Sequence, residues 1–285
     1  QSTRTSSVSY SKTFEDLGLT LSGTFNLSQS VRDSMVSVTL PTLNITLARL
    51  YPFKRKHAVG KERWYEKISF SYSGQMSNSI STKEDKVLKS NLIDDWRNGF
   101  KHSIPINATF QLFDFINITP SFNYTERWYM NKIMQSYDPT MQGNVRKDTI
   151  SGFNRVYNYN LSLQVNSKLY GFFKPWKMFG DKVEMIRHVF TPSVSFSYAP
   201  DFGEARYGYY DTYTYTDDKG EVRTVEYSPY QGMAFGVPGK GMQKSFNFSV
   251  DNNVEMKVKS DKDTTGVKKI SLIDQLSANM SYNAA

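Results

Sequence analysis

Apolar and polar residues alternate along most of the chain. In the stretch LTLSGTFNLSQ, for example, Leu19, Leu21, Phe25 and Leu27 share one parity, and similar stretches recur between turn-forming residues about ten times. Successive side chains of a β-strand point to opposite faces of its sheet, so each stretch predicts a strand with one apolar and one polar face. The pattern therefore predicts an all-β chain of about ten antiparallel strands.

The length of these stretches separates two classes of all-β protein. Strands of globular proteins average five or six residues, whereas several stretches here run for about 10 to 15. A tilted strand needs about 9–11 residues to cross a bilayer. Long strands with one apolar face and one Ser/Asn/Thr/Lys face favour a transmembrane antiparallel β-barrel, or a large section of one. A soluble β-sandwich also alternates and remains the alternative.

One irregularity in the alternation falls beside a proline. Val36, Val38 and Leu40 share a parity, but after Pro41 the apolar positions move by one residue to Leu43, Ile45 and Leu47. A phase shift of one residue next to a proline is typical of a β-bulge. We therefore expect one continuous strand with a bulge at this point.

The connections between strands differ in length. The very short turn at residues 113–115 is assigned to the periplasmic side, and the sides then alternate along the chain. This places the three longest connections on the external side and shorter ones on the periplasmic side, although the short turn at residues 30–33 falls on the external side. The external connections are residues 81–99, 130–151 and 200–241, and the periplasmic ones are residues 51–63, 171–186 and 260–274.

These assignments give one β-barrel region, residues 1–285, with a long extracellular loop at residues 200–242. Within the loop, Tyr213 and Tyr215 alternate before a turn at Asp217-Asp218-Lys219-Gly220, and Val222 and Val225 follow. This pattern predicts a β-hairpin that stands above the membrane or folds over the mouth of the barrel.

The word ERWY occurs twice, at residues 62–65 and 126–129. By parity, both Trp64 and Trp128 belong to the apolar face. Trp and Tyr collect at membrane–water interfaces, so the two words are expected at opposite interfaces. The expected aromatic girdle comprises Tyr51, Trp64, Trp128 and Trp176.

The polar face supplies candidates for a wet path through the barrel. Parity places several amides and one lysine on the lumen side, and two arginines are expected at the rims. These lumen and lipid-path candidates are Asn44, Thr46, Asn107, Asn117, Asn123, Asn160 and Lys168, with Arg63 and Arg127 at the rims. Lys54, Arg55 and Lys56 form a basic periplasmic turn, either simply charged or in contact with a phosphorylated lipid or a periplasmic partner.

Composition narrows the range of functions. The chain has no cysteine, and its three histidines are far apart in sequence, so we expect no metal site and no cofactor. No Ser-His-Asp order carries a nucleophile elbow, and we expect no enzymatic activity. The net charge of +8 is compatible with nucleic acid, but the aromatic residues follow membrane depth instead, so no nucleic-acid partner is expected.

Two stretches resemble a known family. They are ARLYPFKRKHAVGKERWYEKISFSYS (Ala48–Ser73) and DKVEMIRHVFTPSVSFSYAPDFG (Asp181–Gly203). Both are similar to LptD, the lipopolysaccharide-assembly barrel family of the outer membrane, in its Bacteroidetes-type form. The resemblance implies lipopolysaccharide translocation into the outer leaflet without covalent chemistry. It also implies a barrel of about two dozen strands, a plug lipoprotein like LptE, periplasmic Lpt bridge components and contact with membrane lipids.

The resemblance has departures. About ten strands cannot form the family's barrel, so the chain is expected to be a section of it. No periplasmic jellyroll is evident, and the lateral opening of the family cannot be assigned to residues. Another large outer-membrane barrel, such as a TonB-dependent importer or a secretion translocon, and a soluble all-β binding or adhesion protein remain alternatives.

Overall fold

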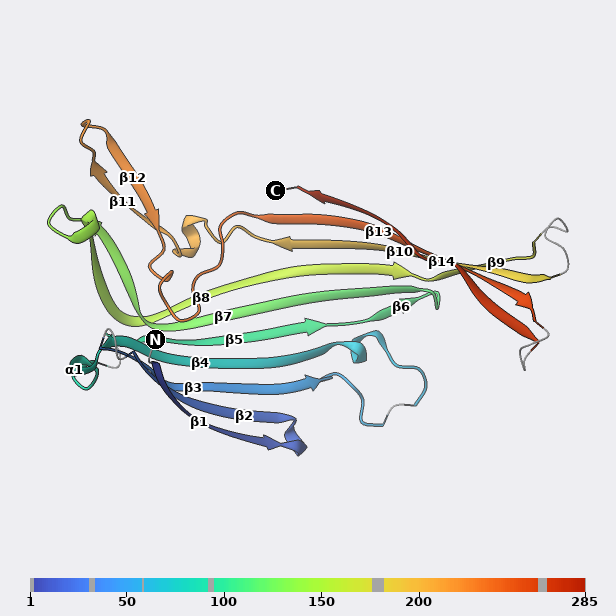
Figure 1. Ribbon diagram of the computed structural model, residues 1–285, viewed down its shortest axis with the longest axis horizontal. Coiled ribbons are helices and arrows are strands. Elements are labelled where there is room, and N and C mark those ends of the chain that lie inside the picture. The colour runs from blue at the N-terminus through green and yellow to red at the C-terminus, as the bar shows by residue number, and fades with distance from the viewer. Residues whose placement is uncertain are drawn as a thin grey trace.

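The structure is a computed structural model that describes residues 3–30, 34–57, 59–91, 95–175, 182–260 and 266–284. Ten long strands lie side by side in one antiparallel sheet, in the order in which they follow along the chain (Figure 1). They are β1 (Thr3–Phe14), β2 (Leu19–Ser30), β3 (Met35–Leu50), β4 (Ser69–Lys83), β5 (Arg97–Asn107), β7 (Ile116–Tyr137), β8 (Val145–Ser167), β10 (Val183–Ala199), β13 (Gln243–Lys259) and β14 (Val267–Asn283).

Shorter elements complete the fold. β6 (Phe110–Leu112) pairs with β7, β9 (Leu169–Phe173) pairs with β10, and β11 (Asp211–Thr216) and β12 (Val222–Tyr227) form a separate hairpin. The helical turns are η1 (Glu15–Leu17), α1 (Glu84–Val87), η2 (Trp64–Lys67), η3 (Gln142–Asn144) and η5 (Ala205–Tyr207). None of the helices in the described residues is long and apolar enough to cross a membrane.

The sheet is open. Within the described residues, β1 pairs only with β2 and β14 pairs only with β13, so each end of the sheet presents an unpaired edge. The prediction of an all-β, antiparallel section of a barrel with about ten long strands is confirmed.

The two faces of the sheet differ in chemistry, as the alternation predicts. One face, here called the apolar face, carries residues such as Leu27, Leu163 and Met280, which are 46%, 41% and 60% exposed. No second sheet covers these rows in the part of the chain that the structure describes. The other face, here called the polar face, carries residues such as Asn123 and Asn160, which lie opposite each other on β7 and β8.

A bulge in β3 keeps the apolar residues on one face. Thr42 lies opposite Thr24 of β2 and Thr39 lies opposite Asn26, so β3 has one more residue than its partner between these pairs. The extra residue falls at Leu40-Pro41, where the peptide bond is cis. The predicted bulge is confirmed.

One of the connections expected on the external side is much shorter than predicted. β7 extends to Tyr137 and β8 begins at Val145, so most of the expected connection 130–151 is strand. The two strands form a hairpin whose turn covers residues 138–144 only. The connections at residues 84–96 and 200–242 are long, as expected.

Two small hydrophobic clusters lie near the end of the sheet from which these connections emerge. The larger one joins Tyr129 and Val156 of the sheet to residues of the connection 200–242. The smaller one packs Trp96 against Val36, Val38 and Ile80, and so covers a short part of the apolar face. Outside these clusters, the described apolar face remains open.

Candidate functional site

The polar face brings the predicted lumen residues onto one surface. Asn44 lies opposite Gln75, Gln75 opposite Lys101, and Lys101 opposite Arg127, so one row of polar side chains crosses four strands. Two strands of this face are also joined through their side chains, because Asn117 donates a hydrogen bond to Asn166 over 3.2 Å. The polar-face residues from the expected path are Asn44, Thr46, Asn107, Asn117, Asn123, Asn160 and Arg127.

Lys168 and Arg63 lie apart from this row. Lys168 stands between β8 and β9 with its ammonium 5.8 Å from the centre of the Tyr170 ring. Arg63 lies in the connection between β3 and β4, outside the sheet, where its guanidinium donates a hydrogen bond to the Tyr65 hydroxyl. The structure therefore does not bring Arg63 to the polar face.

Arg127 is engaged by the connection 200–242. Its Nε donates to the carbonyl of Phe235 over 3.1 Å, and its Nη1 donates to Oδ1 of Asn158 over 2.6 Å. β7 continues beyond it to Tyr137, so Arg127 is not at the end of its strand. Its guanidinium anchors the connection to the polar face.

Tyr129 is the centre of the contact between sheet and connection. Its side chain is fully buried, its hydroxyl donates to the carbonyl of Gly236 over 2.7 Å, and its ring stacks on Tyr230 at 5.8 Å. On the neighbouring strand, a Cβ added at Gly99 would lie 3.0 Å from both Phe235 and Tyr129. The absence of a side chain at Gly99 therefore lets the connection approach the sheet.

Tyr209 covers an unpaired edge of β8. β10 pairs with β8 only as far as the pair Tyr198–Leu161, which leaves the edge beyond without a neighbouring strand. There the Tyr209 hydroxyl receives a hydrogen bond from the Tyr157 N–H over 2.7 Å and donates one to the Tyr157 carbonyl over 2.9 Å. Burial raises the pKa of Tyr209 to about 12, so the hydroxyl stays protonated.

Asp201 closes the base of the connection. Its Oδ1 accepts hydrogen bonds from the backbone N–H groups of Gly203 and Gly241, each over 2.7 Å. The pKa of Asp201 is lowered by these two backbone donors, with a smaller contribution from Lys240. One carboxylate thus joins residues 40 positions apart in sequence.

The predicted hairpin within the connection is present as β11 and β12. Figure 1 shows it projecting away from the sheet, near the turn between β7 and β8. Near its turn the hairpin contacts β7, because Tyr215 stacks on Tyr137 with ring centroids 5.1 Å apart. Residues that flank the hairpin, such as Tyr230 and Phe235, lie against the polar face.

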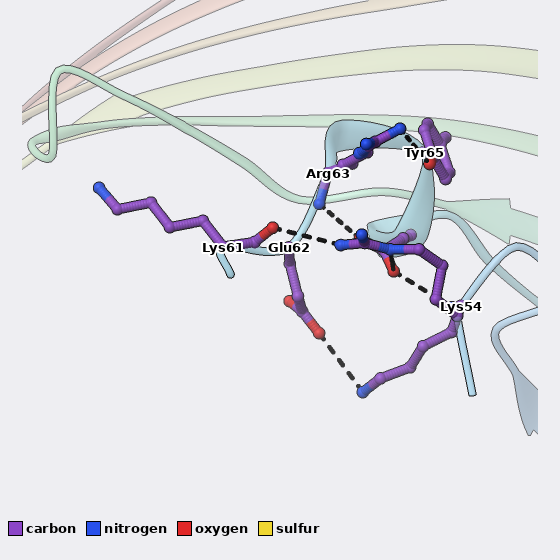
Figure 2. Close-up of polar contacts among 7 residues, drawn as sticks. Lys54, Lys61, Glu62, Arg63 and Tyr65 are labelled. Atoms are coloured by element: carbon purple, nitrogen blue, oxygen red, sulfur yellow. Dashed lines mark hydrogen bonds and ion pairs between the residues drawn. The ribbon is translucent and has the colours of Figure 1, made fainter. Parts of the chain in front are cut away.

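A second polar site lies in the connection after β3 (Figure 2). The carboxylate of Glu66, which is 1% exposed, accepts four N–H groups. Three come from Arg55, namely its backbone N–H, Nε and Nη2 at 3.1, 2.8 and 2.9 Å, and one comes from the backbone of Arg63 at 2.6 Å. These hydrogen bonds, first among them those from the Arg55 side chain, lower the pKa of Glu66 to about 2.

No group of three or more His, Asp or Glu side chains that could hold a metal ion is found among the described residues. The entire chain, residues 1–285, matches the family described as LptD protein. The chain belongs to the LptD family. No curated protein and no solved structure matches it.

Membership of the LptD family agrees with the open all-β sheet. LptD proteins are outer-membrane proteins that take part in lipopolysaccharide transport, and they are transport proteins rather than enzymes. The resemblance noted from two short stretches of sequence thus extends over all 285 residues.

The basic turn of this LptD-family chain is largely neutralised from within. Arg55 is held by Glu66, and Lys54 pairs with Glu62 over 3.4 Å. Figure 2 shows the Lys54–Glu62 contact beside the backbone of Lys61 and Arg63. Of the expected trio Lys54, Arg55 and Lys56, two are therefore committed to the fold of the turn.

The first ERWY word does not lie on a strand. Trp64 and Tyr65 belong to the short helix η2, and β4 begins only at Ser69. The expected parity of Trp64 with the apolar row of β4 is therefore wrong. Its side chain is 66% exposed, that of Tyr51 is 44% exposed, and Trp176 lies outside the described residues.

The second ERWY word lies within β7, with Glu126 and Trp128 on the apolar face. Glu126 pairs with Arg155 of β8 over 2.8 Å and accepts hydrogen bonds from Trp128 Nε1, at 2.6 Å, and from the hydroxyl of Tyr124. An ion pair on a lipid-facing surface is tolerated near the interface and disfavoured at the bilayer midplane. Alternation alone did not reveal this pair, because it follows from the register between β7 and β8.

Proposed function

We propose that this chain is a section of the wall of an outer-membrane β-barrel that translocates lipopolysaccharide and inserts it into the outer leaflet. The observation that carries the proposal is the single-layered sheet with one open apolar face and one polar face. An open apolar face of this extent marks contact with a membrane or a partner. Membership of the LptD family favours the membrane.

The apolar face supplies the energy for insertion. Each Leu, Ile or Phe side chain moved from water into hydrocarbon contributes about 1.5–3 kcal/mol. Exposed side chains of this kind recur along most of the long strands, among them Phe25, Leu43, Leu161 and Phe196. We therefore assign this face to membrane lipids.

The polar face supplies the path for the sugars and phosphates of the substrate. Amide side chains such as those of Asn123 and Asn160 can replace water as hydrogen-bond partners of a hydrated headgroup without a large desolvation penalty. The connection 200–242 lies against this face at one end, and we assign that end to the extracellular mouth. We assign Arg127 to anchoring the connection there.

The partners follow from the same proposal. A section of this kind acts within a closed barrel, with an LptE-like lipoprotein in the lumen and periplasmic Lpt bridge components delivering lipopolysaccharide. Nothing in the proposal requires nucleic acid or a cofactor.

Depletion of the intact gene product in the native bacterium tests the proposal. Newly made lipopolysaccharide is followed at the cell surface by labelling, and depletion is expected to reduce its arrival there. Complementation with Asn123→Leu/Asn160→Leu should restore export poorly, and the matched polar pair Asn123→Ser/Asn160→Ser should restore it well. Unchanged surface lipopolysaccharide after depletion would overturn the proposal.

The same cells separate the rival functions. A TonB-dependent importer would show loss of uptake of a nutrient with normal surface lipopolysaccharide, and a secretion translocon would show loss of a secreted protein. A soluble adhesion protein would fractionate without detergent. We expect the intact protein to remain in the outer-membrane fraction after carbonate extraction.

A further inference from the structure

One end of the sheet extends beyond the rest. Figure 1 shows β9, β10, β13 and β14 continuing past the turn between β6 and β7, at the end opposite to the connection 200–242. The polar face of this extension is not covered by the connection.

The strand register places two rows of side chains on the polar face of the extension. In one row, Phe172 of β9 lies opposite Arg187 of β10, which lies opposite Glu255 of β13. In the next row, Met185 lies opposite Lys257, and Lys257 lies opposite Lys269 of β14. These two rows lie on four strands and border one hollow, whose lining includes Phe172, Met185, Arg187, Glu255, Lys257 and Lys269.

The two lysines in this hollow face each other with the same charge. Like charges directly opposite on neighbouring strands are destabilising. The nearest carboxylate in register, that of Glu255, is already paired with Arg187 Nη2 over 2.6 Å. In the described ranges, no carboxylate forms an ion pair with Lys257 or Lys269.

Arg187 also has one hydrogen-bond donor without an acceptor in the part of the chain that the structure describes. Its Nε is buried and has no hydrogen-bond partner among the described residues, although Nη2 is held by Glu255. An adjacent hollow shares Arg187 and Glu255 and adds Lys168, but it also contains the carboxylates of Asp251 and Asp274. The excess of cationic groups is therefore confined to the first hollow, which, among the described residues, Glu255 alone supplies with a carboxylate.

The chemistry of the hollow fits an amphiphile that carries a phosphate. Lysine ammonium groups bind phosphate as point charges, and an anion between Lys257 and Lys269 would remove their mutual repulsion. Phe172 and Met185 supply apolar surface in the same hollow. A free inorganic anion would use the lysines but would leave this apolar surface unused.

We propose that this hollow binds a phosphate group of lipopolysaccharide, a phosphorylated glycolipid, on the polar face of the extension. The inference rests on the proposed function and adds a specific site to it. Lys257 and Lys269 hold the phosphate, and Phe172 and Met185 contact the apolar part of the same molecule.

Binding of purified lipopolysaccharide to the intact protein with its partners, in detergent, tests the site. Lys257→Gln/Lys269→Gln should weaken binding about tenfold or more, because it removes both charged groups that bond the phosphate. Lys268→Gln is the matched control. Lys268 neighbours Lys269 on β14 but lies opposite Val258, on the other face, so its loss should leave binding unchanged.

A second arm uses the substrate. Enzymatically dephosphorylated lipopolysaccharide should bind the wild-type protein about tenfold more weakly than the native form, and should bind the double variant no more weakly than it binds the wild type. A photo-crosslinking residue at Phe172 should label lipopolysaccharide. Inorganic phosphate alone should compete only at concentrations far above those of the glycolipid.

Several results would overturn the site. They are unchanged binding by a correctly folded double variant, equal binding of the dephosphorylated glycolipid, and full competition by inorganic phosphate at equal concentration. Heat-modifiable migration on gels reports whether the variants fold. If depletion of the wild-type gene product abolishes lipopolysaccharide export but the double variant binds normally, this site is wrong and the proposed function still stands.

Discussion

The two ERWY words show how one four-residue sequence takes two structures in one chain. Residues 62–65 lie in the connection before β4 and enter the short helix η2, whereas residues 126–129 lie within the 22-residue strand β7. The tyrosine that ends the first word is half-buried, and the one that ends the second, Tyr129, is fully buried. The difference shows that the contacts around each word, and not its own four residues, decide which structure it adopts.

Those partners can be identified. In the first word, the backbone of Arg63 is held by Glu66, and Glu66 is held by Arg55 of the same connection. In the second word, every residue faces a strand on each side or the connection 200–242. Local contacts thus organise the first word, and long-range contacts organise the second.

The largest expected difference is between the two tyrosines. Tyr129→Ala should lower the free energy of unfolding by about 3–5 kcal/mol, because it removes a fully buried aromatic side chain. Tyr65→Ala should lower it by about 1 kcal/mol or less, because Tyr65 is only half-buried. Urea unfolding in detergent micelles measures both.

Tyr129→Phe is the control that separates packing from hydrogen bonding. It keeps the ring and removes the hydrogen bond to Gly236, so about 1 kcal/mol should be lost. Equal effects of Tyr129→Ala and Tyr65→Ala would contradict the distinction between the two words.

The next largest difference is expected between the glutamates that begin the two words, in their effect on the free energy of unfolding. Glu126→Gln leaves Arg155 without a counter-charge on the apolar face and should lower the free energy of unfolding by about 2 kcal/mol. Glu62→Gln removes an exposed pair with Lys54 and should change it by about 0.5 kcal/mol or less. The same unfolding assay in micelles applies, and a larger effect at Glu62 would reverse the assignment.

The stability of the connection that contains the first word should depend on pH. The pKa of Glu66 is lowered from its ordinary value of 4.5 to about 2, so its stabilisation is complete above about pH 4.5 and is lost as the pH falls through 2. The protection of the backbone N–H groups around Arg55 and Arg63 against hydrogen exchange, measured relative to the intrinsic rate at each pH, should therefore fall in this range. Glu66→Gln should show little protection at all pH values, and wild-type protection that is constant from pH 5 to 2 would argue against the ion pair as the anchor.

The smallest expected effect is a difference in fluorescence quenching between the tryptophans of the two words. Trp128 lies on the apolar face with its ring 4.1 Å from His102, whereas Trp64 is 66% exposed outside the strands. Brominated acyl chains should quench the fluorescence assigned to Trp128 more than that assigned to Trp64. The assignment uses the difference spectra of Trp128→Phe and Trp64→Phe, and equal quenching would place both words at the same depth.

The alternation of apolar and polar residues predicted most of the fold. It predicted the strands, their two faces and the bulge at Pro41, because period-two burial is a local property of a strand. It failed at Trp64, since parity has meaning only inside a strand and nothing local marks Ser69 as the start of β4. It also did not foresee that β7 and β8 continue through most of residues 130–151, where polar residues occupy both faces.

The candidate site was predicted less completely. Placement of Asn123 and Asn160 on one face follows from alternation and is present in the register. The engagement of Arg127 by Phe235 and the facing lysines Lys257 and Lys269 were not predicted, since each depends on which strands or connections become neighbours. A search for like charges on adjacent predicted strands would have found the second feature only if the register were known.

The bulge at Leu40-Pro41 has a consequence for how this sheet can change through insertion and deletion. Removing one residue there would straighten β3 and turn either residues 36–39 or residues 42–47 over, which would move apolar side chains to the polar face and polar side chains to the apolar face. Removal of two residues elsewhere in a strand keeps every side chain on its own side. Length variation among related chains should therefore come in even steps within the strands, and odd steps should coincide with the gain or loss of a bulge.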